Sequence, residues 1–290
     1  MSELIQLGAH SYYISSHPNV GVYVINDCAY LIDSGLNETQ AAEYLSLIQA
    51  RGWTLQAVLN THYHADHVGG NHYLQEATGC SCYCPLPEFA ADPILNPSLL
   101  FGATPPQALH TEIFLAQASQ AQELTPAILP EGLQLIALPG HCRTQYGIMT
   151  CDGVFYCADA VIGEEELERY KISHLYDLGA YLSSISLLEN TEAAWYVPSH
   201  EKALRDIRPL AAKNRASCEA LIAWILEDCA GDGLTHDALL KAVFDRIGRR
   251  LHLAQYALSG CTLRAYLSYL LDRGQLEARV RENLVFFCVV

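Results

Sequence analysis

The 290-residue sequence has no long uninterrupted hydrophobic run. A helix needs about 20 mostly apolar residues to cross a bilayer, and no stretch of about 18 or more occurs, so we expect no membrane span. The first residues, MSELIQLGAHSYYI, lack a basic patch followed by an apolar core, so we expect no secretory signal. These absences predict a cytoplasmic protein.

The sequence is also poor in basic residues over most of its length. Residues 1–204 carry 5 Lys and Arg against 22 Asp and Glu, a net charge of −17, whereas residues 205–290 carry 12 against 10, a net charge of +2. A surface this acidic repels polyanions at long range. We therefore expect a small neutral or weakly charged substrate, and not a nucleic acid, as the partner.

The 11 cysteines show no disulfide framework, because their number is odd and no secretory signal accompanies them. Cys80, Cys82 and Cys84 alternate along an expected strand, with no second Cys or His pair to complete a zinc site. Free cysteines of this kind pack as small hydrophobic side chains, and that is the role we predict for them.

The composition is that of a globular protein with a sizeable core, since 51% of residues are hydrophobic and 17% are charged. A chain of 290 residues can form one large domain, or one domain with an appendage. The organisation of the chain has to be read from its local patterns.

Four side chains that can bind metal lie within six residues, in the run His62-Tyr63-His64-Ala65-Asp66-His67. His62 and His64 are two residues apart, so they point to the same side of an extended backbone. The preceding run LQAVLN (55–60) is typical of a buried strand, and Val68 to Ala77 is typical of a helix. The run therefore sits on a strand-to-helix turn, where three or four ligands could hold one metal; the alternative is a polar loop without metal.

Three later strands each lead to a further potential ligand. The runs Leu133–Leu138, Val154–Ala158 and Trp195–Val197 are followed by His141, Asp159 and His200. Taken alone, each histidine could be an ordinary hydrogen-bonded residue. Together they repeat one arrangement, a strand that ends in a ligand, and open sheets commonly place their sites at such an edge.

The remaining elements are expected from turn and cap signals. The strands are 4–7, 11–14, 21–25, 29–33 and 79–85, with a turn at Asn26-Asp27, and a helix runs from the N-cap Asn37 to Arg51. Residues 86–130 hold seven prolines, and Gln107–Ala121 is predicted to be helical. This insertion is either a substrate lid or pocket wall, or a structural excursion on the surface.

The C-terminal part reads as helices at 207–229, 234–247 and 263–271, followed by a hairpin of 275–279 and 284–289. This is the outline of a winged-helix-like unit. We predict two domains, 1–204 and 205–290, and expect the second to serve in packing or as a homodimer contact, because its net charge is only +2.

In this order, the seven ligand candidates resemble those of the metallo-β-lactamase-fold hydrolase superfamily, over residues 4–204. The run Leu31-Ile32-Asp33-Ser34-Gly35 matches the early strand-turn motif of that superfamily. The resemblance implies an α/β fold, an αβ/βα sandwich with two mixed sheets facing each other, helices outside and metals at the rim. More loosely, the C-terminal unit resembles the small helical domain of the β-lactamase-like protein 2 endoribonucleases.

The resemblance also implies two divalent metal ions, with zinc as the first choice and iron or manganese as alternatives. His62, His64 and His141 would hold one ion, Asp66, His67 and His200 would hold the other, and Asp159 would bridge both. True β-lactamases of the superfamily commonly have Cys at the position of Asp159 and no ligand at that of His67. The chain is therefore similar to the glyoxalase II, lactonase and ribonuclease side, although Gln145 replaces the second histidine of the glyoxalase II pattern PGHTxGH.

The implied activity is that of a dinuclear hydrolase. A hydroxide shared by the two ions would attack the carbonyl of a small thioester, ester or lactone, and Asp66 would orient it and carry a proton to the leaving group. The alternatives are a metal-dependent endoribonuclease, and a metal-binding redox partner, which would usually carry a flavin-binding domain. Pocket roles for His17, Tyr63, Arg143, His174 and Tyr176 stay open, and Cys142 is expected to be a packed thiol.

Overall fold

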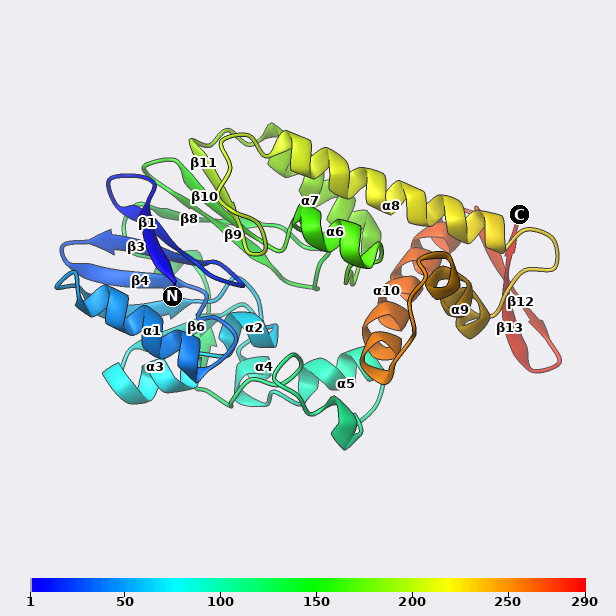
Figure 1. Ribbon diagram of the computed structural model, residues 1–290, viewed down its shortest axis with the longest axis horizontal. Coiled ribbons are helices and arrows are strands. Elements are labelled where there is room, and N and C mark those ends of the chain that lie inside the picture. Colours follow the sequence, from blue (N-terminus) through cyan, green and yellow to red (C-terminus); the bar gives the residue numbers. More distant parts are fainter. Residues whose placement is uncertain (1) are drawn as a thin grey trace.

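The computed structural model describes residues 2–290 and contains two β-sheets that face each other (Figure 1). The first sheet has the order β1 (Glu3–Gln6), β2 (Ser11–Ser15), β3 (Val20–Ile25), β4 (Cys28–Ile32), β5 (Thr54–Leu59), β6 (Ser81–Cys84), β7 (Ala121–Glu123). The second has the order β11 (Trp195–Pro198), β10 (Val154–Ala158), β9 (Tyr146–Thr150), β8 (Leu133–Ala137). Both are mixed, because β4 to β7 run parallel in the first sheet, as do β10 and β11 in the second, while the other neighbours are antiparallel.

Side chains alternate between the two faces of each sheet, and this alternation creates the layers. In β5, Leu59 packs between the sheets with Ile148 of β9, whereas Val58 packs outward under Tyr44 of α1 (Glu38–Gln49). Helix α3 (Asn71–Thr78) covers the same outer face. On the second sheet, Phe155 packs outward against α7 (Leu178–Asn190). The layers are therefore helix, sheet, sheet, helix, which confirms the predicted αβ/βα sandwich.

Local signals of the sequence account for the first elements. The turn between β3 and β4 has positive φ at Asn26 and Asp27, 49° and 60°, a conformation that these two residue types tolerate better than most. The Asn37 side chain accepts a hydrogen bond from the backbone N–H of Gln40, so it caps α1 as predicted.

The insertion at 86–130 contains α4 (Pro87–Ala91), α5 (Leu95–Phe101) and the 3-10 turns η1 (Gln107–Leu109) and η2 (Pro126–Ile128). The predicted helix over 107–121 is wrong, because only η1 is helical and the segment ends in β7. Ala121–Glu123 pairs with the edge of β6, and the Gln75 side chain exchanges two hydrogen bonds with the backbone of Gln120. This pairing outweighs the helix propensity of the segment, which is a weak preference.

The C-terminal part contains α8 (Arg208–Asp228), α9 (His236–Arg246), α10 (Leu253–Asp272) and the hairpin of β12 (Leu276–Arg281) and β13 (Leu284–Val289). Helix α8 runs from the sandwich to this hairpin (Figure 1). Helix α10 starts at Leu253 and not at Leu263, because its first turns bury small or polar residues that give no apolar pattern, such as Ala257 and Ser259. One hydrophobic core contains residues of α7, α8, α9 and α10, so packing is continuous across the boundary predicted at residue 204. The two-domain division and the winged-helix likeness therefore stay predictions.

The structure was also searched for membrane spans. Between residues 2 and 290, every helix falls short of the length or the apolar character that crossing a bilayer requires.

Candidate metal centre

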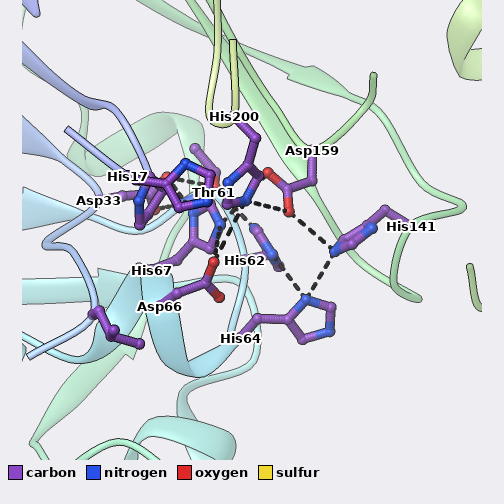
Figure 2. A network of polar contacts seen from close by, with 12 residues as sticks. His17, Asp33, Thr61, His62, His64, Asp66, His67, His141, Asp159 and His200 are labelled. Atoms are coloured by element: carbon purple, nitrogen blue, oxygen red, sulfur yellow. Dashed lines mark hydrogen bonds and ion pairs between the residues drawn. The ribbon is translucent and has the colours of Figure 1, made fainter. Parts of the chain in front are cut away.

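The seven ligand candidates converge at one edge of the two sheets (Figure 2). Each lies on a loop or short helix that follows a strand: His62, His64, Asp66 and His67 after β5, His141 after β8, Asp159 after β10 and His200 after β11. The prediction that these distant segments of the chain meet at a sheet rim is therefore confirmed. Their role as metal ligands is a separate matter and remains a proposal.

The loop that carries the four-residue cluster is held by a close backbone approach at Gly69 and Gly70. The predicted helix from Val68 to Ala77 is broken here into α2 (Ala65–Val68) and α3. A Cβ atom on Gly69 would lie 2.0 Å from the carbonyl oxygen of Leu36, so only glycine fits. The approach lets the Gly69 N–H donate to Gly35 O at 3.0 Å, which docks the turn after β4 against the cluster.

The first group of donors consists of His62, His64 and His141. His64 Nδ1 lies 3.1 Å from His62 Nε2 and 2.9 Å from His141 Nε2. Zinc binds histidine nitrogen at about 2.0–2.1 Å, so two nitrogens on one ion lie roughly 3–3.5 Å apart. The two distances from His64 are close to this spacing, and the donor atoms of all three residues lie within 4.8 Å of one another.

The second group consists of Asp66, His67 and His200. Asp66 Oδ2 lies 3.6 Å from His67 Nε2 and 3.5 Å from His200 Nε2. A nitrogen and an oxygen on one cation have a similar separation. The second group is therefore spaced like the first.

Asp159 lies between the two groups. Its Oδ1 is 3.5 Å from His67 Nε2, and its Oδ2 is 3.2 Å from His141 Nε2 and 3.5 Å from His200 Nε2. Donor atoms of His62, His67 and Asp159 also form a compact set of their own. The carboxylate of Asp159 thus faces both groups, as a bridging ligand must.

The outer nitrogens of three histidines are fixed by hydrogen-bonding partners. His67 Nδ1 lies 2.8 Å from Asp33 Oδ2, His141 Nδ1 lies 3.1 Å from the carbonyl oxygen of His174, and His62 Nδ1 lies 3.1 Å from Thr61 Oγ1. When the outer nitrogen is held by an acceptor, the inner nitrogen is free to bind a cation. From the sequence, Asp33 was expected only as part of the strand-turn motif. The structure shows that its carboxylate holds the ring of His67.

The charges of the donors are set by burial and by one another. Burial, followed by neighbouring imidazoles, holds the pKa of His62 and of His64 well below the ordinary value, so both rings are neutral. For His67, burial would lower the pKa, but the carboxylates of Asp66 and Asp33 outweigh it and raise the pKa well above the ordinary value.

The two carboxylates show the opposite balance. Burial would raise their pKa values, but His67 beside Asp66 and His200 beside Asp159 hold both pKa values below the ordinary value. Anionic oxygens and neutral imidazoles are the forms that bind divalent cations. His62, His64 and His141, whose pKa values are lowered by burial, have this form, whereas His67 and His200, whose pKa values the carboxylates raise, would release a proton when a cation binds.

Two buried atoms in the cluster test whether a cation fits. His67 Nε2 and Asp159 Oδ1 are buried, and neither has a hydrogen-bond partner. Buried polar atoms are nearly always paired, so such a pair facing each other at 3.5 Å calls for a shared partner. Nitrogen and carboxylate donors without a thiolate suit zinc, iron(II) or manganese. The residues therefore fit a divalent metal site.

A cavity of about 450 Å³ opens over the cluster. Its walls include Asn96 and Leu100 of α5, and Gln255 and Leu258 of α10. The insertion is thus a pocket wall and not a surface excursion, and the C-terminal helix α10 is a second wall.

Of the five residues whose place in the pocket the sequence left open, two line the cavity and three do not. His17 and His174 line the cavity, whereas Tyr63, Arg143 and Tyr176 do not. Tyr63 is buried and stacks on Phe89 with ring centroids 4.1 Å apart, so its role is structural.

The cysteines behave as predicted. Cys142 is buried beside a candidate ligand, and its thiol donates to the carbonyl oxygen of Thr144, as expected for a packed side chain. Cys80, Cys82 and Cys84 are buried as well.

A family model for the metallo-beta-lactamase superfamily matches residues 16–200. The protein belongs to that superfamily. Among curated relatives, it is similar to the hydroxyacylglutathione hydrolase of Methylococcus capsulatus, with 43% identity over 60 residues, which is 21% of this chain and 23% of that protein. It is similar to the hydroxyacylglutathione hydrolase of Brucella anthropi, with 28% identity over 167 residues, 46% of this chain and 64% of that protein. The chain thus spans less than two thirds of the length of these relatives.

Solved structures show the same fold at low identity. A beta-lactamase domain protein from Burkholderia ambifaria superposes with a TM-score of 0.75 and 19% identity, covering 99% of this chain and 94% of that one. A metallo-beta-lactamase family protein from Thermus thermophilus gives 0.71 and 18%, covering 100% and 98%. A metallo-beta-lactamase from Hirschia baltica gives 0.56 and 17%, covering 74% of this chain and 97% of that one. The likeness to the first two structures extends over the C-terminal helices.

Proposed function

We propose that this protein is a metal-dependent hydrolase that uses two divalent ions to cleave a small thioester, ester or lactone. The observation that carries the proposal is the convergence of seven metal-binding side chains beside a cavity. Two of their buried atoms, His67 Nε2 and Asp159 Oδ1, have no hydrogen-bond partner. Similarity to proteins named hydroxyacylglutathione hydrolase supports a thioester substrate.

We assign the donors to two ions, with zinc as the proposed metal. One ion would be held by His62, His64 and His141, the other by Asp66, His67 and His200, with Asp159 shared. A pair of such ions, when bound, lowers the pKa of coordinated water to about 7 and polarises a carbonyl oxygen. The chain has to supply orientation, proton transfer and a sheltered site.

Asp66 is the residue we propose for proton transfer. Its side chain is 28% exposed against 5% for Asp159, and it lines the cavity, so it can reach both the ligand cluster and a substrate. Its carboxylate is ionised at neutral pH, and because His67 holds its pKa low, a proton that it accepts is held only weakly. It can then pass that proton to the leaving group.

Two other features of the chain support the chemistry. The hydrogen bond from His67 to Asp33 keeps His67 Nε2 directed into the cluster. The walls from α5 and α10 narrow the access of bulk water to the reacting carbonyl, which strengthens electrostatic interactions there.

The test is hydrolysis of a thioester and lactone panel before chelation, after exhaustive chelation and after zinc is restored. We expect activity to disappear with the metal and to return with it. Hydrolysis that continues undiminished in the chelated protein would overturn the proposal.

The endoribonuclease alternative has weaker support. Its C-terminal outline is present, but among the described residues no Lys or Arg lines the cavity, and residues 1–204 carry a net charge of −17. RNA cleavage measured over a salt series would reveal it, because polyanion binding weakens steeply as salt rises. The cytoplasmic location and the homodimer stay predictions.

A further inference from the structure

The cavity over the ligand cluster has an apolar half that the proposed chemistry does not use. Six apolar side chains, contributed by the turn after β4, the insertion, the segments flanking α6 (Glu164–Tyr170) and α10, line it. They are Leu36, Leu100, Phe114, Ile162, Ile172 and Leu258. Contact with such a surface favours an apolar group on the ligand.

This apolar wall is held in place by packing on its far side. Leu100 and Phe114 of the insertion are 6% and 3% exposed, and they pack in one cluster with Ala257 and Leu258 of α10. Figure 1 shows α10 reaching down to α5 at this point. The wall is therefore formed before a ligand arrives, which lowers the entropic cost of binding.

Outside the metal cluster the cavity surface offers no lysine or arginine to an anion. Among residues 2–290 no Lys or Arg contributes to it, and His17 lies 3.4 Å from the carboxylate of Glu166. Arg169 and Arg249 lie over the ring of Tyr170, with their guanidinium carbons 5.3 and 5.0 Å from its centroid, and neither lines the cavity. A ligand carboxylate that enters the cavity away from the metal cluster would lose water without meeting a Lys or Arg, which is unfavourable.

Two neutral amide side chains, on the neighbouring helices α5 and α10, have oxygen atoms without a hydrogen-bond partner. Asn96 of α5 is 6% exposed, and its Oδ1 is buried with no hydrogen-bond partner; the same is true of Oε1 of Gln255 on α10. Both oxygens are closed off from solvent, and leaving a buried acceptor unpaired costs about 1–3 kcal/mol, so a rotation of either side chain that brings its oxygen to a ligand N–H or O–H would be favoured. An amide offers both a donor and an acceptor to such side chains.

We infer that the substrate is an uncharged acyl thioester or lactone that carries an apolar acyl chain and an amide. This inference rests on the proposed hydrolase function. The acyl chain packs against Leu100, Phe114 and Leu258, and the amide pairs with Asn96 and Gln255. Glutathione thioesters, which carry two carboxylates, are excluded as good substrates, in contrast to what the names of the curated relatives suggest.

The test compares two thioester series that differ only in the thiol. One series is S-acyl-N-acetylcysteamine, which is neutral and has an amide; the other is S-acylglutathione, and the acyl group runs from acetyl to octanoyl in both. We expect kcat/KM to be at least 10-fold higher for the neutral series and to rise up to about fourfold per methylene as the chain lengthens. Equal or faster cleavage of the glutathione series, or no dependence on chain length, would overturn the inference.

The same assay separates this inference from the proposed function. Every rate is measured with and without chelator. If neither series, nor any ester or lactone assayed beside them, is cleaved in a metal-dependent manner, the proposed function fails. If glutathione thioesters are cleaved well and only with metal, the function stands and the inference fails.

Variants locate the wall. Leu100→Ala should flatten the chain-length dependence, whereas Leu99→Ala, at a 42%-exposed position on the same helix outside the cavity, should keep it. Leu258→Ala, on the neighbouring helix α10, provides a second test if Leu100→Ala does not fold. A chain-length dependence unchanged in a folded wall variant would contradict the assignment.

A further variant tests the amide pairing. Asn96→Leu should lower kcat/KM for N-acetylcysteamine thioesters more than for ethanethiol thioesters of the same acyl group, which lack the amide. An equal loss with both thiols would contradict the pairing.

Discussion

His67 Nδ1 lies 2.8 Å from Asp33 Oδ2, and both side chains are buried. Asp33 also accepts hydrogen bonds from the backbone N–H and the hydroxyl of Thr61, each at 2.8 Å. Because a carboxamide oxygen accepts the hydrogen bond from His67 Nδ1–H more weakly than a carboxylate oxygen does, Asp33→Asn should hold the His67 ring less firmly. Loss of a partner of this kind typically costs about 10–100-fold in metal affinity.

This prediction is checked by competing the protein against a chelator of known zinc affinity. Asp245→Asn is the matched control, because Asp245 lies on α9 and pairs with Lys241, away from the cluster. Zinc affinity that is equal in Asp33→Asn and in the control would show that Asp33 does not act through His67.

His64→Ala is predicted to remove metal binding and hydrolysis together while the chain stays folded. His64 Nδ1 is within 3.1 Å of two other donor nitrogens, so its loss opens the first group. Since partners behind a ligand are worth about 10–100-fold, loss of a ligand should lower kcat/KM by more than about 100-fold.

Metal content and thioester hydrolysis, measured on the same sample, test this prediction. His72→Ala is the control, because His72 contacts the backbone of Ala118 and not the cluster. Full activity in His64→Ala, or equal loss in His72→Ala, would rule out the proposed role.

Gly69→Ala is predicted to destabilise the fold. The new Cβ would lie 2.0 Å from the carbonyl oxygen of Leu36, so the backbone would have to move apart. Overpacking of this kind typically costs about 1–3 kcal/mol in the free energy of unfolding.

Urea titration of Gly69→Ala and Gly179→Ala measures the difference. At Gly179, near the start of α7, the added Cβ would be 3.5 Å from its nearest neighbour, which is ordinary contact. Alanine there should be neutral or stabilising by up to about 1 kcal/mol, because it favours helix. If the two variants had the same free energy of unfolding, the close approach at Gly69 would not contribute to stability.

Removal of metal should lower the thermal stability. A ligand that binds only the folded chain stabilises it by about 2.7 kcal/mol at a concentration 100 times its Kd. For a chain of 290 residues that corresponds to roughly 4–5 °C in Tm. Melting curves recorded with chelator and with excess zinc check the shift, and identical curves would argue against a structural contribution of the metal.

The sequence predicts the ligand cluster well because each ligand follows a strand whose apolar pattern is clear. β5, β10 and β11 are short, apolar and buried, so the edge at which they end was predictable. The spacing of His62 and His64 carried the remaining information, because it fixes the side to which both rings point.

The walls of the cavity could not be predicted in the same way. The segment after Gln107 has favourable helix propensity, but the free edge of β6 captures Ala121–Glu123 as a strand. The start of α10 was missed because the buried residues of its first turns, such as Ala257 and Ser259, are small or polar. Asn96 and Gln255 were missed because they stand out only through side-chain oxygens without a hydrogen-bond partner, and such atoms can be identified only in the folded chain.

The central claim is that seven side chains hold a pair of ions, and metal stoichiometry tests it most directly. The purified protein is loaded with zinc, dialysed and analysed for metal per chain, with His64→Ala treated in parallel. We predict two ions per chain for the native sequence and fewer for the variant. A native protein that retains no zinc after loading, or a variant that binds as many ions as the native protein, would contradict the account.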